Sequence, residues 1–237
     1  HPVIVHGGGP KISSTMEKMG KKPKFIHGQR VTDEETMDIV EMVLGGIVNK
    51  EIVSLINKHG GKAIGLSGKD GGLIKAKKKL MKKTSQKTGV EEIIDLGLVG
   101  EVTDINSQAL KSLEKEGFIP VISPIGIGEH GETFNINADY VASSISAKLK
   151  AEKLILLTDV PGIKDKKGNT ISTLSQKQIK KLVSESTISG GMLPKTQACM
   201  KALEDGVAKT HIIDGRISHC LLLEIFTKEG IGTEIVK

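Results

Sequence analysis

Short apolar segments alternate with longer amphipathic stretches along the chain. Runs of apolar residues, each bounded by glycine or polar residues, predict buried strands at residues 3–5, 63–66, 118–122, 153–157 and 210–213. Stretches with helical spacing predict helices from about residue 11 and at residues 33–59, 106–116, 138–148, 175–184, 192–205 and 219–226. Strands that alternate with helices form a mostly parallel sheet covered on both faces. We therefore predict an α/β fold with an open, mainly parallel central sheet sandwiched by helices.

The longest predicted helix covers residues 33–59. Thr32 is its predicted N-cap, and Glu35 three residues later completes a capping box. Gly45 and Gly46 interrupt its apolar stripe, although each glycine costs about 1 kcal/mol relative to alanine. Either a helix of a second copy or close packing on the chain's own sheet would explain them, and both explanations stay open. The stripe consists of Ile39, Met42, Val43 and Ile47.

Weaker patterns lie between these elements. Residues 71–104 predict short β-rich segments, and residues 126–132 predict a hairpin. The length of 237 residues allows one large or two small domains. We predict a single domain with an N-lobe of about residues 1–134 and a C-lobe of about residues 135–237. Because the first residues already show a strand pattern, we also expect a native N-terminal strand to be missing.

Composition narrows the class of protein. With 38% hydrophobic and 26% charged residues, the chain is typical of a globular protein, and no apolar run approaches the roughly 20 residues that span a bilayer. Two cysteines, Cys199 and Cys220, are too few for a disulfide framework or a four-thiolate metal site, and they fit a reducing cytoplasm. These observations exclude a membrane-spanning protein and a thiolate-based metal enzyme.

The net charge of +6 suggests an anionic partner. The densest basic run, residues 75–87, contains no aromatic residue, and the whole chain has four Phe, one Tyr and no Trp for stacking on bases. We therefore favour a solvated lysine-rich face, or an attraction for anionic small molecules, over nucleic acid. Only Arg30 and Arg216 are arginines, and we expect them to mark positions where a planar, two-pronged donor matters.

Three glycines follow the first predicted strand, in the segment from His6 to Pro10. Their N–H groups, together with the start of the next helix, suit an anion, and a plain tight turn is the alternative. The loop is not a Walker A motif, because no Gly-Lys-Ser/Thr ends it. It is not a dinucleotide fingerprint either, because Ile12 stands where the last glycine belongs.

Two polar groups of residues suit a substrate. Arg30 lies on a short predicted strand before the long helix, where its fork suits a carboxylate, and a surface ion pair is the alternative. Asn135, Asn137 and Asp139 alternate ahead of the next helix, so three polar groups could converge. Capping by Asn137, with Asp139 favoured by the helix dipole, explains two of the three without any function.

Two later segments suit a nucleotide. Thr158 and Asp159 end a strand before a Pro-Gly turn, and Gly190 and Gly191 precede a helix that carries Lys195. Turn structure alone also explains both segments. Three further residues lack partners at the spacing of a catalytic triad or zinc site and are interpreted as core or surface residues: Cys199, His6 and His219.

Taken in order, six motifs resemble the amino-acid kinase family, and within it the arginine-sensitive branch that phosphorylates N-acetylglutamate in arginine biosynthesis. They are HGGGP, GQRVTD, NINAD, LTDVPGI, GGMLPK and HCLLLEIFTKEGIGT, and together they span nearly the whole chain. The resemblance implies an N-lobe that holds the acyl amino acid and forms a dimer, and a C-lobe that holds ATP. It also implies Mg²⁺, held mainly by the nucleotide phosphates.

The resemblance also assigns individual residues. For the acyl amino acid it implies Gly8, Gly9, Arg30, Asn135 and Asn137, with the two glycines facing the γ-carboxylate and the migrating phosphoryl group. For catalysis it implies Lys195, which stabilises the transferring phosphate, and Asp139, which organises the active-site lysines, beside Gly8 and Gly9. For ATP it implies Thr158, Asp159, Val160, Gly162, Ile163, Gly190, Gly191, Met192 and Lys195.

Regulation is implied in the same way. The arginine-sensitive branch binds L-arginine as an inhibitor, and the matching positions are His211, Glu224, Gly230 and Lys153. A solvated helix position is the alternative for Glu224. The branch joins dimers into a hexamer through an N-terminal helix, and a nitrogen-status signalling protein is a further implied partner. Neither a nucleic acid nor a membrane is an expected partner.

One departure from the family pattern bears on activity. The family begins with a strand that ends in Lys-x-Gly-Gly and supplies a second phosphate-binding lysine, and nothing before His1 provides it. We therefore expect an incomplete catalytic set in the chain as written. Two other functions stay open: a lysine-pathway kinase acting on acetylaminoadipate or a carrier-linked glutamate, and a non-catalytic arginine sensor.

Overall fold

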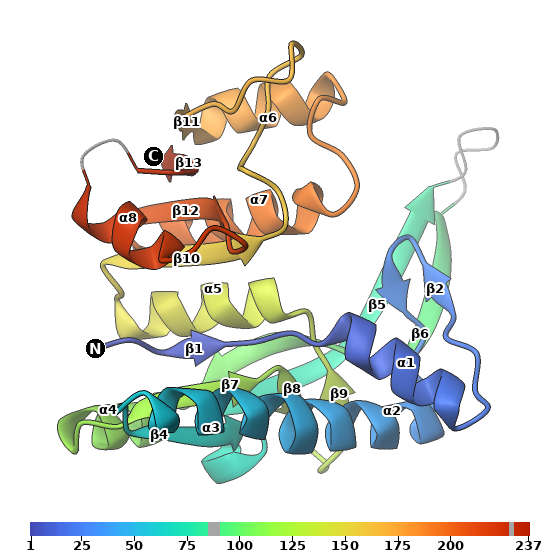
Figure 1. The fold of residues 1–237 in the computed structure, drawn as a ribbon. Coiled ribbons are helices and arrows are strands. Elements are labelled where there is room, and N and C mark those ends of the chain that lie inside the picture. Colours follow the sequence, from blue (N-terminus) through green and yellow to red (C-terminus); the bar gives the residue numbers. More distant parts are fainter. Residues whose placement is uncertain (85–90, 228–229) are drawn as a thin grey trace. The chain divides into compact units, whose positions relative to one another are not determined.

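The computed structural model describes residues 1–84, 91–227 and 230–237 (Figure 1). The chain forms two compact units, residues 1–141 and 142–237, which are described separately. The sequence placed a division before Asn135, whereas the units divide inside α5 (Ala138–Leu149). The reason is that β9 (Thr133–Asn135) pairs with strands of the first unit.

The first unit contains a parallel sheet in the order β1-β7-β4. Its strands are β1 (Ile4–Val5), β7 (Ile119–Ser123) and β4 (Ala63–Ser67). Val5 and Leu66 both stand beside Ile122 of β7, whose side chain is fully buried. Because the three strands run in one direction, the loops after them meet at one edge of the sheet, where ligands bind in open α/β sheets.

A long helix consists of three successive segments, the last two of which pack on this sheet. They are α2 (Glu34–Glu41), a π-helical stretch η1 (Met42–Val48) and α3 (Asn49–Lys58). Inward-facing residues of α2 and η1 pack against α1 (Gly9–Lys18) in one core cluster: Ile12, Met16, Met37, Ile39, Val40, Val43 and Leu44. This unit also contains a short 3-10 helix, η2 (Asp70–Gly72), and α4 (Gln108–Lys115).

The predicted capping box of this helix is wrong. Asp33 is the N-cap, and its side chain accepts a 2.8 Å hydrogen bond from the N–H of Thr36. Thr32 is instead buried in backbone pairing, because its N–H donates to the carbonyl of Leu96. Glu35 forms an ion pair with Lys21 at 2.7 Å and does not return to the helix start.

Residues 71–104 form longer strands than the sequence predicted. β5 (Ile74–Thr84) and β6 (Glu91–Ile105) pair as one long antiparallel arm, which closes a barrel with β8 (Ile125–Ile127) and β9 (Figure 1). Acidic residues of β6 face the lysines of β5, with Lys77–Glu101 at 3.0 Å and Lys78–Asp95 at 2.7 Å. The described part of the basic run is therefore partly neutralised, and Lys87 lies outside the described residues.

A short hairpin completes the first unit. β2 (Phe25–Ile26) and β3 (Gln29–Arg30) pair antiparallel, with Phe25 opposite Arg30. The connecting residues His27 and Gly28 both have positive φ, as a tight hairpin turn requires. This turn places Arg30 on a strand immediately before the long helix, as predicted.

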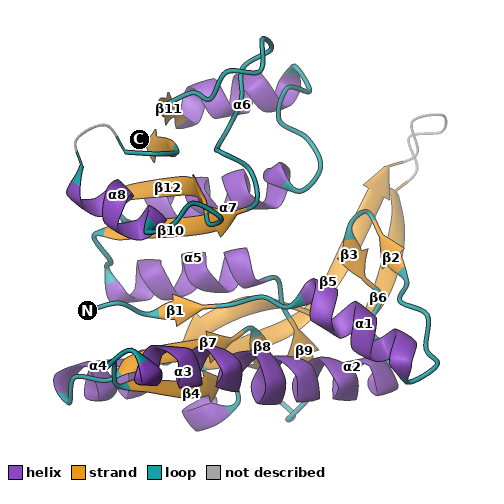
Figure 2. Cartoon of the chain, viewed as in Figure 1, coloured by secondary structure: helices purple, strands orange, loops and turns teal. Residues whose placement is uncertain are grey.

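The second unit holds a four-stranded sheet in the order β10-β12-β13-β11 (Figure 2). Its strands are β10 (Lys153–Thr158), β12 (Lys209–Asp214), β13 (Thr233–Val236) and β11 (Thr173–Ser175). Its helices after α5 are α6 (Gln176–Ser184), α7 (Met192–Glu204) and α8 (Cys220–Phe226). β12 and β13 are antiparallel and the other two pairs are parallel. The predicted α/β class is confirmed, although β11 and β13 were not predicted.

Candidate active site

The glycine loop lies between β1 and α1, at the carboxyl edge of the first sheet. Gly8 is the N-cap of α1, and a Cβ there would lie 2.6 Å from Cδ2 of Leu44, so a larger residue would require the Leu44 side chain to shift. A Cβ on Gly9 would meet nothing within 4 Å. Among the described residues, no acceptor bonds to the N–H of Gly8 or Gly9. Two donors at a helix N-terminus therefore remain for an anion.

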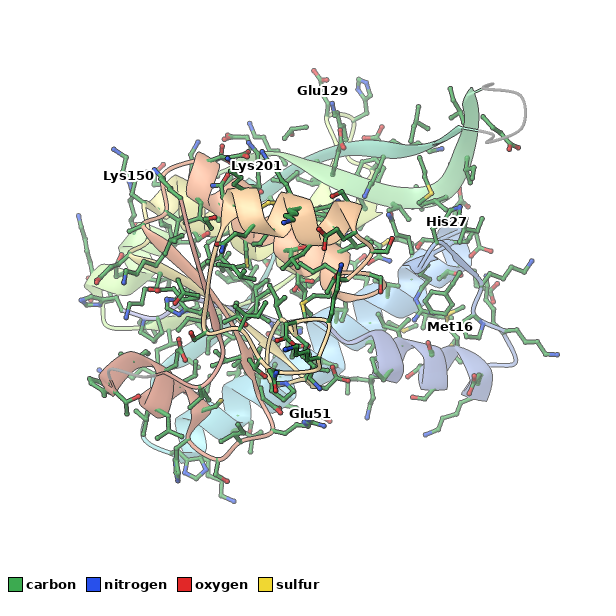
Figure 3. The ribbon with its side chains drawn as sticks, turned by 90° about the horizontal axis from the view of Figure 1, so that it is seen from above. Met16, His27, Glu51, Glu129, Lys150 and Lys201 are labelled. Atoms are coloured by element: carbon green, nitrogen blue, oxygen red, sulfur yellow. The ribbon has the colours of Figure 1, made fainter. Side chains whose placement is uncertain are left out.

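Arg30 reaches this loop from β3. Its Nη2 donates to the carbonyl of Gly9 at 3.0 Å and to Oγ of Ser13 at 2.8 Å, and its Nη1 lies 3.2 Å from Sδ of Met16, which Figure 3 labels. The guanidinium also stacks on the ring of Phe25, 4.7 Å from the centroid. The structure therefore joins Arg30 to the start of α1, and neither Ser13 nor Phe25 was predicted.

The charge of Arg30 is not balanced within the described part of the chain. The residue is only 7% exposed, and no carboxylate of the described residues forms a salt bridge with it. Burial lowers the pKa of its guanidinium, which nevertheless stays a cation at any physiological pH. The alternative of a surface ion pair is wrong. A buried cation with only neutral partners favours an anionic ligand.

Asn135 belongs to the same group, but Asn137 has another partner. Nδ2 of Asn135 donates to Oγ1 of Thr32 at 3.2 Å, and that hydroxyl donates to the carbonyl of Arg30 at 3.1 Å. Oδ1 of Asn137 accepts from the N–H of Asp139 at 2.8 Å, which caps α5. The structure thus links Asn135 through Thr32 to the backbone of Arg30, whereas the bonds of Asn137 match the capping alternative.

In the second unit, the ends of β10 and β12 stand side by side. Thr158 pairs with Asp214, and the N–H of Gly215 donates to the carbonyl of Thr158 at 2.8 Å. Arg216 donates to the buried Asp214 carboxylate from Nε at 2.9 Å and from Nη2 at 2.7 Å. These bonds lower the pKa of Asp214 to about 2. The sequence singled out Arg216 for its rarity, but its partner Asp214 was missed.

The turn after β10 is fixed by the last strand. Gly162 has φ +146°, and a Cβ there would lie 2.7 Å from Oγ1 of Thr233. The same hydroxyl accepts from the N–H of Ile163 at 2.9 Å, and Ile163 is buried. Thr158, Asp159 and Val160 precede this turn. The end of the predicted nucleotide segment, at Gly162 and Ile163, is therefore held against β13.

The second glycine pair begins α7. Gly191 is its N-cap, Gly190 has φ +54°, and a Cβ on either would meet nothing within 4 Å. The N–H groups of Met192 and Leu193 bond within this turn, to the carbonyls of Ser189 and Gly190 at 3.2 Å each. Lys195 lies in the first turn of α7. At this helix start no acceptor within the described residues bonds to the N–H of Gly190 or Gly191, while the next two N–H groups are already paired.

The predicted effector residues form a buried cluster. Nδ1 of His211 lies 2.6 Å from Oε1 of Glu224, and both side chains are 6% exposed. Oε2 of Glu224 accepts from the N–H of Ile231 at 2.8 Å, next to Gly230 with φ +62°. The alternative of a solvated Glu224 is wrong. No bond within the described residues joins Lys153 to this cluster, and positions 228 and 229 lie outside them.

Other candidates are settled by burial. Cys199 and His6 are buried and His219 is exposed, in agreement with core positions for the first two and a surface position for the third. Within residues 1–84, 91–227 and 230–237, no three His, Cys, Asp or Glu side chains gather closely enough to hold a metal ion. No helix in the same part of the chain is long and apolar enough to cross a membrane.

Comparison with known proteins adds independent findings. The profile of the amino acid kinase family matches residues 1–214. The acetylglutamate kinase of Syntrophus aciditrophicus is 59% identical over 236 residues, which cover 100% of this chain and 80% of that protein. Among solved structures, smu.665 from Streptococcus mutans has a TM-score of 0.80 at 29% identity, over 99% of this chain and 85% of that one. The N-acetylglutamate synthase of Neisseria gonorrhoeae, complexed with coenzyme A and N-acetyl-glutamate, has a TM-score of 0.83 at 26% identity. The match covers 99% of this chain and 51% of that chain.

Proposed function

The chain belongs to the amino acid kinase family, and we infer that it transfers the γ-phosphoryl group of ATP to the γ-carboxylate of N-acetyl-L-glutamate. The product is N-acetyl-L-glutamyl 5-phosphate, an intermediate of arginine biosynthesis. The observation that carries this inference is the 59% identity to an acetylglutamate kinase along the whole chain. The cluster of Arg30, the glycine loop and Asn135 supports it, because it offers donors for an acidic amino acid.

The first unit supplies groups for the acyl amino acid. Arg30 is held in place by Gly9 and Ser13, so its remaining N–H donors are oriented before a ligand arrives. We assign the α-carboxylate of N-acetylglutamate to Arg30, with Asn135 next to it. Asn137 stays a predicted contact. Because its side chain caps α5, it would bind the substrate only through its backbone or after that cap has rearranged.

The reaction needs little covalent help from the protein. An oxygen of the γ-carboxylate forms a bond to the γ-phosphorus while the bond to the β,γ-bridging oxygen breaks, and ADP leaves. A carboxylate is already the nucleophile, so no general base is required. We assign the N–H groups of Gly8 and Gly9 to the oxygens that carry charge during this transfer.

The nucleotide groups are proposed from the family resemblance. The turn from Thr158 to Ile163 and the start of α7 are assigned to ATP, and Lys195 to charge on the transferring phosphoryl group. Asp139 is assigned to the positioning of lysines. Mg²⁺ would accompany ATP on its phosphates, since the described residues offer no carboxylate cluster for it, and it would neutralise phosphate charge.

A homodimer through the long helix is part of this proposal. The apolar stripe consists of a buried half and an exposed half. Ile39 and Val43 are buried in the chain's own core, whereas Met42 is 51% exposed and Ile47 is 39% exposed. A Cβ on Gly45 or Gly46 would meet nothing within 4 Å, so packing within the described chain does not require glycine there. The approach of a second helix supplies a reason for both glycines. A hexamer, a signalling partner and a cytoplasmic location are carried by the resemblance alone.

L-Arginine is proposed as an inhibitor at the cluster of His211 and Glu224. Nε2 of His211 is buried and has no hydrogen-bond partner among the described residues. A polar atom of the ligand would supply that partner. Both oxygens of Glu224 already accept bonds, so arginine must replace or share them. Calorimetry with L-arginine should give heat that Glu224→Ala abolishes, and an unchanged isotherm would reject this site.

The proposed reaction is tested with the protein as the cell makes it. ADP release is coupled to NADH oxidation with N-acetylglutamate or N-acetylaminoadipate as acceptor, and hydroxylamine traps the acyl phosphate as a hydroxamate. We expect turnover and hydroxamate with N-acetylglutamate. Preference for N-acetylaminoadipate would move the chain to the lysine-pathway alternative, and turnover with neither would leave an arginine-binding sensor.

A further inference from the structure

His6 directly follows β1 and immediately precedes the glycine loop. Its N–H donates to the carbonyl of Ile122 at 3.2 Å and so continues the pairing with β7. The side chain is 8% exposed and touches two polar groups. Nδ1 lies 2.9 Å from the carbonyl oxygen of Gly7, and Nε2 lies 3.1 Å from Nδ2 of Asn49.

The bonds of Asn49 determine which nitrogen of His6 carries the proton. Nδ2 of Asn49 lies 2.9 Å from the carbonyl oxygen of Val121, so this atom must be the amide NH₂, and it donates to Nε2 of His6. Nδ1 of His6 faces a carbonyl and must therefore be the N–H. Only the neutral imidazole with its proton on Nδ1 satisfies all these contacts. Burial, the largest cause, lowers the pKa of His6 and favours this neutral form.

The surroundings of Asn49 are shaped to hold this amide. Asn49 is the first residue of α3 and is 1% exposed. Its Oδ1 accepts from Nζ of Lys50 at 3.2 Å. A Cβ on Gly65 of β4 would lie only 1.8 Å from that oxygen, so the strand leaves the space for the amide. Asn49 thereby ties α3 to β7 and to His6.

The bond from His6 sets the direction of a catalytic peptide group. The peptide between Gly7 and Gly8 is trans, so its C=O and N–H point in opposite directions. Because the carbonyl of Gly7 is held by the imidazole, the N–H of Gly8 must face away from His6. That N–H is one of the two donors that the described residues leave open at the start of α1.

We propose that His6 is a positioning residue of the kinase, which orients the Gly7–Gly8 peptide so that the N–H of Gly8 faces the phosphoryl group during transfer. The proposal rests on the proposed function, since it needs that N–H to meet the reacting oxygens. Asn49 holds the imidazole in the required ring orientation and tautomer. The effect of His6 therefore falls on the transition state and not on the binding of either substrate.

The test compares His6→Ala, His6→Asn and His6→Gln. Loss of one oxyanion donor costs about 10²–10³ in kcat, so its misorientation in His6→Ala should cost about 10- to 100-fold. Both KM values should stay within about twofold of the wild type. An amide N–H of Asn replaces Nδ1–H, whereas Gln reaches the place of Nε2, so His6→Asn should recover more kcat than His6→Gln.

Controls separate this inference from its alternatives. His59→Ala removes an exposed imidazole after α3 and should leave kcat unchanged. Thermal melting identifies a purely structural role, in which His6→Ala loses stability but its folded fraction keeps the wild-type kcat. That result, or equal recovery by Asn and Gln, would overturn the inference and leave the kinase assignment intact. No turnover by the wild type with N-acetylglutamate would overturn the proposed function as well.

Discussion

The two arginines of the chain lie in opposite electrostatic environments. Arg30 in the first unit is buried and, within the described residues, bonds only to neutral atoms of Gly9, Ser13 and Met16. Arg216 in the second unit has a side chain that is 65% exposed, and it holds the buried carboxylate of Asp214. A buried cation with neutral partners favours an anionic ligand, whereas a paired arginine stabilises its own strand end. The same residue type therefore indicates a binding group in one unit and a structural one in the other.

The two glycine-containing helix starts also differ, although only in part, because the N–H groups of Gly190 and Gly191 likewise have no acceptor among the described residues. The N–H groups of Gly8 and Gly9 have no acceptor in the described part of the chain, whereas those of Met192 and Leu193 bond within their own turn. The first unit thus presents donors that need no rearrangement before an anion binds. In the second unit, we expect the phosphate charge to depend on Lys195 more than on backbone N–H groups.

The largest expected effect tests this dependence on Lys195. Lys195→Ala should lower kcat by about 10²–10³, because a fixed ammonium stabilises charge that develops on the phosphoryl oxygens. KM values should change much less, as measured by steady-state kinetics. Lys201→Ala, further along α7 and paired with Asp205, is the matched control and should keep its activity. A near-native kcat for Lys195→Ala would show that the backbone of the second unit suffices.

Exchanging each arginine for lysine tests the comparison directly. Arg30→Lys keeps the charge but loses the fork, and a charge-assisted bond of about 1.5–3 kcal/mol predicts a 10- to 100-fold rise in KM for N-acetylglutamate. KM for ATP should change little. Arg216→Lys is the matched control and should leave KM for N-acetylglutamate unchanged. Equal effects of the two exchanges would refute the distinction between them.

A third prediction concerns the exposed face of the long helix in the first unit. Gly45→Leu should weaken self-association by about 10-fold or more, because an inserted side chain in a close contact costs about 1–3 kcal/mol. Its own chain has room for the side chain, so the melting temperature of the monomer should hold. Analytical ultracentrifugation measures the association. An unchanged dimer constant would place the interface elsewhere.

The smallest effect concerns the ion pair of the second unit. The pKa of Asp214 is lowered to about 2 by Arg216, so the pair stabilises the fold above the ordinary aspartate pKa near 3.9. This contribution is lost as the pH falls through about 2. Arg216→Gln should therefore lower the urea midpoint at pH 6, with the difference from the wild type shrinking between about pH 4 and pH 2. A difference that is constant with pH would mean that the pair is not electrostatic in origin.

Sequence reasoning succeeded where the signal is local. Gly8 and Gly9 follow an apolar strand directly, and Arg30 precedes a helix with clear periodicity, so their places could be predicted from neighbouring residues. It failed where two neighbouring residues competed for one role. Thr32 and Asp33 are both good N-caps, and the pairing of Thr32 with the distant Leu96 decided in favour of Asp33.

The sequence by itself determined the α/β alternation, the glycine loop and the candidate donors, because spacing of apolar residues and glycine placement act within a few residues. Only the tertiary structure decided which donors remain open and which charges are paired. The contact between His6 and Asn49 joins residues 43 positions apart, and that between Arg30 and Ser13 joins residues 17 apart. The pairs Asp214–Arg216 and His211–Glu224 are close in sequence, yet the burial of Asp214, His211 and Glu224 depends on how the surrounding elements pack. Pairing across such separations depends on how strands and helices pack, which no local pattern encodes.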